Sequence, residues 1–162
     1  MKPVIRKTTG DDKVLVKIIA CISDIECSGY FSELIDMSDP EQKIKVKQFQ
    51  GAVISKLICE MSEVSWKPEH KPDQEKRDSI DIYGEGKGCV VAIELDAHRA
   101  DQVAKKFVSR MAILPRSKKT YYISLCYPGT KNMSKNECVK YFNYCAELAS
   151  RMGSHYAGLI IE

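Results

Sequence analysis

The eight residues Cys89 to Asp96, CVVAIELD, constrain the fold of this chain most strongly. They are apolar and rich in β-branched residues, which favours a buried strand. A helical pattern follows almost at once, from about Arg99 to Leu114, and Pro115 ends it. A buried strand that leads directly into an amphipathic helix is typical of α/β proteins, in which helices pack on the faces of a sheet.

Length and composition are those of one globular domain. The chain has 162 residues, of which 44% are hydrophobic and 29% are charged, so it can bury a proper core. The net charge of +3 neither requires nor excludes a nucleic-acid partner. We expect a single domain at 1–162, in which an N-terminal helical segment (1–38) precedes an α/β core (39–162).

The first third of the chain predicts two helical segments. Residues 13–36 have a helical apolar pattern with a weak point at Ser28-Gly29. Ser38 begins the second helix, because the proline and the acids that follow it suit a first helical turn. The apolar stripe of that helix recurs at three- and four-residue steps and consists of Val46, Phe49, Val53, Leu57, Met61 and Val64.

Beyond this point short strands alternate with helices. Residues 67–78 contain two prolines and many charges, which predicts a surface loop. The runs at 79–84 and 89–96 flank a GKG turn and predict a β-hairpin. After the helix that starts near residue 99, we expect a strand at 120–127, a helix between Ser134 and Gly153, and a strand at 155–162. These elements predict helices flanking a mixed sheet.

Two acids end the strand at 89–96. Side chains alternate between the two faces of a strand. Glu94 and Asp96 therefore project together from one face, while Val91, Ile93 and Leu95 face a core. The competing interpretation is two solvated acids at a strand end, which also suit the dipole of the helix that follows.

Two further acids are expected nearby. The hairpin can bring Asp81 beside Glu94, and Glu60 falls inside the apolar stripe of its helix at 100° per residue. Carboxylates this close repel one another by several kcal/mol unless a cation neutralises them. Oxygen ligands favour hard ions. The predicted site would therefore bind Mg²⁺ or Mn²⁺, and its ligands would be Asp81, Glu94, Asp96 and Glu60.

The helix after the acids carries a polar ridge. Such a ridge beside an acidic metal site suits a polyanionic substrate, because cations hold phosphates while acids hold the metal. The predicted phosphate-binding side chains are Arg99, Gln102, Lys105 and Arg110.

Asp81 on one strand, Glu94-Leu95-Asp96 at the end of the next, and a basic helix behind them resemble the PD-(D/E)xK nuclease superfamily over roughly residues 40–127. The resemblance implies a restriction-endonuclease-like three-layer α/β/α core. It makes Asp81 the first motif acid and Glu94 the second, and it matches Glu60 to an acid often found on the first core helix. Gln102 resembles a glutamine that RecB-like members carry.

One motif position departs from that family. Its third motif residue is normally lysine, which helps to orient or deprotonate the attacking water, and here Asp96 takes its place. Some restriction enzymes of the superfamily carry an acid there. Other members supply a lysine from the following helix, which Lys106 or Lys105 could do. A third alternative is a degenerate, inactive site.

The resemblance implies a Mg²⁺-dependent endonuclease that hydrolyses DNA, in which Asp81, Glu94, Asp96 and Lys106 carry the catalysis. A homodimer would allow such a small enzyme to cut both strands. The alternative is a non-catalytic module of the same fold that binds nucleic acid or protein. We expect a cytoplasmic protein with no membrane partner, since no run approaches the ~20 apolar residues of a span and the cysteines fit apolar patterns.

Overall fold

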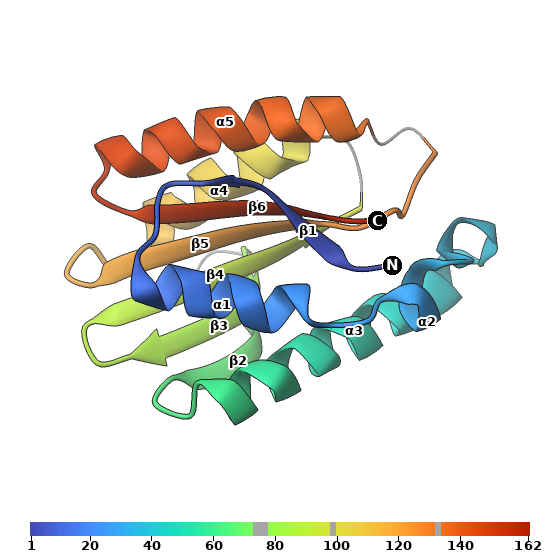
Figure 1. Ribbon diagram of the computed structural model, residues 1–162, viewed down its shortest axis with the longest axis horizontal. Helices are drawn as coiled ribbons and strands as arrows, with labels where there is room; N and C mark the ends of the chain where they lie inside the picture. Colours follow the sequence, from blue (N-terminus) through green and yellow to red (C-terminus); the bar gives the residue numbers. More distant parts are fainter. Residues whose placement is uncertain (73–77, 98–99, 132–133) are drawn as a thin grey trace.

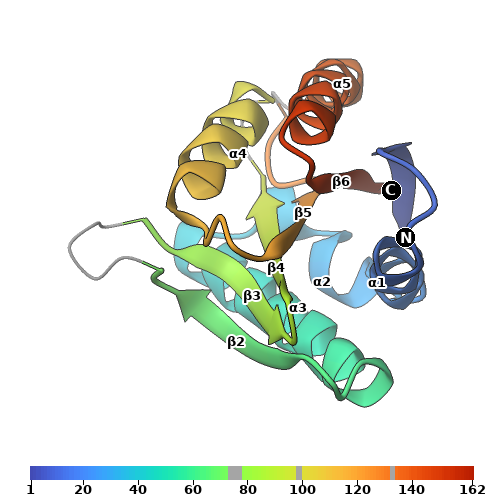
Figure 2. The same cartoon turned by 90° about the vertical axis from the view of Figure 1, so that its left-hand side faces the viewer.

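The computed structural model describes residues 1–72, 78–97, 100–131 and 134–162. They form an α/β fold in which helices cover both faces of one six-stranded sheet (Figures 1 and 2). The strands are β1 (Pro3–Thr8), β2 (Ser65–His70), β3 (Ile80–Gly86), β4 (Cys89–Asp96), β5 (Lys119–Cys126) and β6 (His155–Ile161). The helices are α1 (Lys13–Ser23), α2 (Ser28–Phe31), the 3₁₀ turn η1 (Leu34–Asp36), α3 (Asp39–Glu60), α4 (Asp101–Ile113) and α5 (Lys135–Arg151). None of the described helices is long and apolar enough to cross a membrane.

The sheet is mixed, as expected. Its strand order is β1-β6-β5-β4-β3-β2. β4, β5 and β6 are parallel to one another, while β3 runs antiparallel to β4, β2 to β3, and β1 to β6. The predicted hairpin is confirmed: β3 and β4 are joined by a tight turn in which Gly88 adopts a φ of 80°. Glycine adopts that left-handed conformation without a steric penalty.

Two hydrophobic cores lie on opposite faces of the sheet. On one face α1 and α3 pack against Val91, Ile93 and Leu95 of β4. On the other face α4 and α5 pack against Val90 and Ala92. The predicted alternation along β4 is therefore confirmed, and both faces of this central strand are buried, as is usual for strands in parallel pairing.

Helix α3 begins where the sequence predicts. The Ser38 hydroxyl and backbone N–H both donate to Glu41 Oε2, at 2.6 and 2.9 Å, which closes a capping box at the helix N-terminus. The predicted apolar stripe is confirmed at Phe49, Val53 and Leu57, which are fully buried against the sheet, whereas Met61 and Val64 are buried beyond the end of the helix at Glu60. This helix is consequently fixed against the edge of the sheet formed by β2 and β3.

The sequence predicts a helical N-terminal segment, and the structure corrects this prediction. Residues Pro3–Thr8 form β1, which pairs antiparallel with β6, so this segment belongs to the same sheet as the rest of the chain. The break in the helical pattern lies at Asp24–Cys27, and Ser28-Gly29 begins α2 instead of interrupting a helix. β1 is an edge strand, so most of its side chains are exposed and its residues do not alternate between buried and exposed. The period-two pattern that predicts strands is therefore absent here.

Part of the predicted loop at 67–78 is also a strand. Ser65–His70 form β2, the opposite edge of the sheet. A proline removes one backbone donor, and an edge strand tolerates that loss, so Pro68 did not prevent pairing. Trp66 anchors the strand by packing on Gly84, where an added Cβ would lie only 2.6 Å from the indole ring.

Candidate active site at the end of strand β4

Three carboxylates surround one lysine at the carboxyl end of β4. The Nζ of Lys106, from α4, lies 3.3 Å from Glu94 Oε2, 3.6 Å from Asp81 Oδ2 and 4.0 Å from Asp96 Oδ2. It also donates a 2.8 Å hydrogen bond to the Leu95 carbonyl. The sequence prediction that Asp81, Glu94 and Asp96 converge is confirmed, and Lys106 joins them from the following helix. We call these four side chains the carboxylate–lysine cluster.

Asp81 reaches the cluster because β3 stops pairing with β4 there. The last paired residues are Ile82 and Ile93, and beyond them the Asp81 side chain replaces a backbone partner by accepting a 2.8 Å hydrogen bond from the Leu95 N–H. Gln50 of α3 also holds this residue, since its Nε2 donates to the Asp81 carbonyl. Asp81 is thus fixed at both its backbone and its carboxylate.

Glu94 is buried between two basic side chains of α4, Lys106 and Arg110. Its side chain is 2% exposed, and Oε1 accepts a 2.8 Å hydrogen bond from Arg110 Nε. Oε2 faces the Lys106 ammonium at 3.3 Å. The charged form of this buried carboxylate therefore depends on the two cations beside it.

The electrostatics of the cluster follow from this burial. Burial, with the charge of Asp81 adding to it, raises the pKa of Glu94 to about 7, although Lys106 and Arg110 act in the opposite direction. Burial alone would lower the pKa of Lys106, but Asp81, Glu94 and Asp96 together raise it above its usual value. Lys106 is therefore an ammonium at neutral pH, and Glu94 is the acid of the cluster that can exchange a proton near neutrality.

A divalent metal fits this cluster only as a hydrated ion. The described residues contain no group of three or more His, Cys, Asp or Glu side chains arranged as a metal cage. Mg²⁺ does not require such a cage, because proteins usually hold it through one or two carboxylates while it keeps several waters. The oxygens of Asp81, Glu94 and Leu95 already face one cation, the Lys106 ammonium. These oxygens could hold a hard, hydrated ion if the Lys106 ammonium moved out of the space between them.

Glu60 does not face inward, which corrects the sequence prediction. Its side chain is 47% exposed and lies 3.6 Å from Lys56, which also binds Asp24 of α1. Gln50 of α3 contacts Asp81. Glu60 lies ten residues further along the same helix, which at 1.5 Å per residue is about 15 Å, so it is too far away to join the cluster. Glu60 shares the helical face of the apolar stripe, but at this end of α3 that face meets solvent and the residues at the end of α1, where the sheet no longer covers it.

Arg110 is not part of an exposed ridge either. It is buried, and besides Glu94 it binds Asp78 Oδ1 at 2.6 Å through Nη1. Its guanidinium binds carboxylates inside the protein, so Arg110 does not belong to the exposed ridge that the sequence predicts. Of the other ridge residues, Gln102 donates to Asp101 at 3.4 Å and Lys105 is exposed. Arg99 lies outside the described residues.

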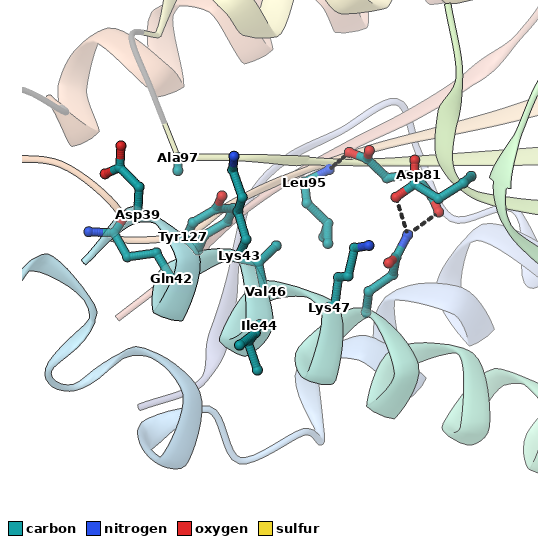
Figure 3. A pocket seen from close by; sticks show the side chains of 12 residues that line it. Asp39, Gln42, Lys43, Ile44, Val46, Lys47, Asp81, Leu95, Ala97 and Tyr127 are labelled. Atoms are coloured by element: carbon teal, nitrogen blue, oxygen red, sulfur yellow. Dashed lines mark hydrogen bonds between the residues drawn. The ribbon is translucent and has the colours of Figure 1, made fainter. Parts of the chain in front are cut away.

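A pocket of 520 Å³ opens on the α3 side of the same strand end. It is lined by Asp81 of the cluster and by Leu95, and α3 contributes Lys43 and Lys47 to its wall (Figure 3). Gln50 of α3 lines it as well. The sequence reasoning missed these three α3 residues. Their spacing of three and four residues was a readable signal, since it places them on one helical face beside the apolar stripe.

Searches of protein-family models and of curated proteins find no match to this chain. The assignment of a function therefore depends on the geometry and chemistry of the site.

Proposed function

We propose that this protein is a Mg²⁺- or Mn²⁺-dependent nuclease of restriction-endonuclease-like fold that hydrolyses phosphodiester bonds in DNA. The observation that carries the proposal is the position of Lys106 Nζ, within 4.0 Å of all three carboxylates. Acids that hold a metal and a cation that contacts the reacting phosphate are the two components that phosphodiester hydrolysis needs.

The fold supports this proposal. The elements from α3 to β5 follow the order helix, three antiparallel strands, helix, strand, which resembles the core of PD-(D/E)xK nucleases. The motif lysine that Asp96 replaces has a substitute in Lys106, since its ammonium reaches the same carboxylates from α4. Of the three alternatives for the altered motif, we favour the one in which the following helix supplies the lysine.

Each side chain of the cluster has a distinct role in this proposal. Asp81 and Glu94 would hold the Mg²⁺ or Mn²⁺, and the Leu95 carbonyl lies beside them. The metal would supply Lewis-acid stabilisation of charge on the phosphate. Lys106 orients a water or stabilises negative charge, and it does not remove a proton, because its raised pKa keeps it charged. Asp96 adds negative charge that holds the Lys106 ammonium in place.

A cytoplasmic location and a DNA substrate belong to the same proposal. All seven cysteines are free thiols, which suits a reducing compartment. A homodimer would give the enzyme two clusters, one for each strand of a duplex. Sedimentation with and without duplex DNA would measure that association.

Cleavage of supercoiled plasmid and of single-stranded DNA, in Mg²⁺, Mn²⁺ or EDTA, tests the proposal. We expect cleavage that needs the metal and that falls at least about 100-fold in Asp81→Asn and in Lys106→Met, since each removes a group that acts on the transition state. The matched control is Asp24→Asn, which removes a surface carboxylate paired with a lysine. Absence of metal-dependent cleavage by the unaltered protein would exclude the enzymatic function.

The alternative is a non-catalytic module of the same fold that binds nucleic acid. Lys106 favours it in one respect, because an internal ammonium already neutralises the carboxylates without any metal. A module of this kind would bind DNA equally well in Mg²⁺ and in EDTA, and Mg²⁺ would not raise its melting temperature.

A further inference from the structure

We propose that Lys43 and Lys47 of α3 form the surface that binds the phosphodiester backbone of the DNA and leads it to Asp81. This inference rests on the proposed function for the nature of the ligand. It goes beyond that function by placing the strand on the α3 side of β4, whereas the sequence had placed it on α4.

The two lysines share one face of the helix and one pocket. They are four residues apart, and their side chains line the pocket opposite the end of β4 (Figure 3). Both are exposed, and neither forms an ion pair with a residue in the described ranges. Lys56, Lys118 and Lys119 each bind a carboxylate. The charges of Lys43 and Lys47 are therefore not neutralised by a carboxylate among the described residues.

The pocket continues into the carboxylate–lysine cluster. Asp81 belongs to both, since it lines the pocket and lies 3.6 Å from Lys106, and Leu95, which also lines the pocket, accepts a hydrogen bond from Lys106 at its carbonyl. A phosphate held by Lys43 or Lys47 would thus lie next to the one carboxylate of the three that is 24% exposed. Glu94 and Asp96 are only 2% and 4% exposed, so Asp81 is the carboxylate of the cluster most open to a ligand.

Two further acids line the pocket, and both have local functions. Asp39 lies in the first turn of α3, where a negative charge interacts favourably with the helix dipole. Glu69 accepts hydrogen bonds from Gln50 at 3.3 Å and from Ser79 at 3.5 Å. The phosphates are consequently expected along the wall of Lys43 and Lys47, and away from β2.

A pair of matched double variants tests this inference. Lys43→Gln/Lys47→Gln removes both pocket lysines, and Lys13→Gln/Lys17→Gln removes two exposed lysines with the same spacing on α1. Binding of fluorescent duplex and single-stranded oligonucleotides is measured by anisotropy in EDTA at several salt concentrations. EDTA prevents metal-dependent cleavage and leaves every residue of the cluster unchanged.

We expect the pocket variant to bind duplex DNA about 10-fold more weakly. The slope of log K against log salt should become shallower by about 1.8 for duplex and about 1.4 for single strands, since each lost phosphate contact removes ~0.9 or ~0.7. The α1 variant should show neither change. Equal loss in both variants, or no loss in the pocket variant, would overturn the inference.

The two proposals fail separately. If the unaltered protein does not cleave but only the pocket variant loses DNA affinity, the binding surface stands and the enzymatic function does not. If metal-dependent cleavage is present while both double variants bind equally, the nuclease function stands and the surface on α3 is wrong.

Discussion

Helices α3 and α4 bring positive charge to the same strand end from opposite faces of the sheet. On α4, Lys106 and Arg110 point into the protein and are paired with buried or partly buried carboxylates. On α3, Lys43 and Lys47 line an open pocket without an ion-pair partner in the described part of the chain. Basic side chains therefore have two roles here, and the packing around each helix determines which role a side chain takes.

This difference follows from the cost of burying charge. A carboxylate as buried as Glu94 needs a fixed cation, so Arg110 and Lys106 are held in place by the protein itself. Lys43 and Lys47 of α3 face no buried carboxylate among the described residues, and both are exposed to solvent. We infer that the α4 side is a preformed centre and that the α3 side is completed by a ligand.

Removal of Arg110 should give the largest change in stability. We expect Arg110→Ala to lower the free energy of unfolding by about 3–5 kcal/mol, because it leaves Glu94 buried without its hydrogen-bonded cation. Urea denaturation measures the change. Lys105→Ala on the same helix is the control and should stay within about 0.5 kcal/mol. Similar values for the two variants would show that the α4 charges are not structurally required.

The pH dependence of stability tests the burial of Glu94. Its folded pKa of about 7 lies above the ordinary value of 4.5, so its contribution to stability is complete below pH 4.5 and is lost as the pH rises through 7. We expect this to cost on the order of 2–3 kcal/mol between pH 5 and 8 in EDTA. Denaturation of Glu94→Gln across this range should lack that component, and parallel curves for the two proteins would contradict the raised pKa.

Gln50 links the two sides, and its loss should have an intermediate effect. Gln50→Leu leaves the Asp81 carbonyl without the donor that α3 provides, at a cost of about 1–3 kcal/mol. Thermal unfolding measures it, with Gln48→Leu at an exposed position of the same helix as the control. If the two variants melt at the same temperature, the contact between α3 and Asp81 contributes nothing to stability.

Glu60 should give the smallest effect. Glu60→Ala removes an exposed side chain whose ion-pair partner among the described residues is Lys56, so stability should change by less than about 0.5 kcal/mol. Its rate of metal-dependent cleavage should equal that of the unaltered protein. A large loss of cleavage would return Glu60 to the set of metal ligands.

Elements with a clear period could be predicted from the sequence. The alternation along β4, the β3–β4 hairpin and the capping box of α3 are local, and each has its own signal in consecutive residues. The two edge strands were missed for the converse reason. β1 and β2 expose most of their side chains, so their pairing depends on neighbours distant in the sequence.

The sequence was enough to predict that Glu94 and Asp96 share a face and that the hairpin can bring Asp81 to them, because a strand alternates with a period of two. The resemblance to the nuclease superfamily offered Lys106 or Lys105 of the next helix as one of three alternatives for the altered motif position. The packing of the folded chain was needed to show that Lys106 enters the cluster, that Arg110 is buried, and that Glu60 is exposed. A helical period fixes the angle of a side chain, but whether that angle meets solvent, a carboxylate or a pocket depends on the elements packed against the helix.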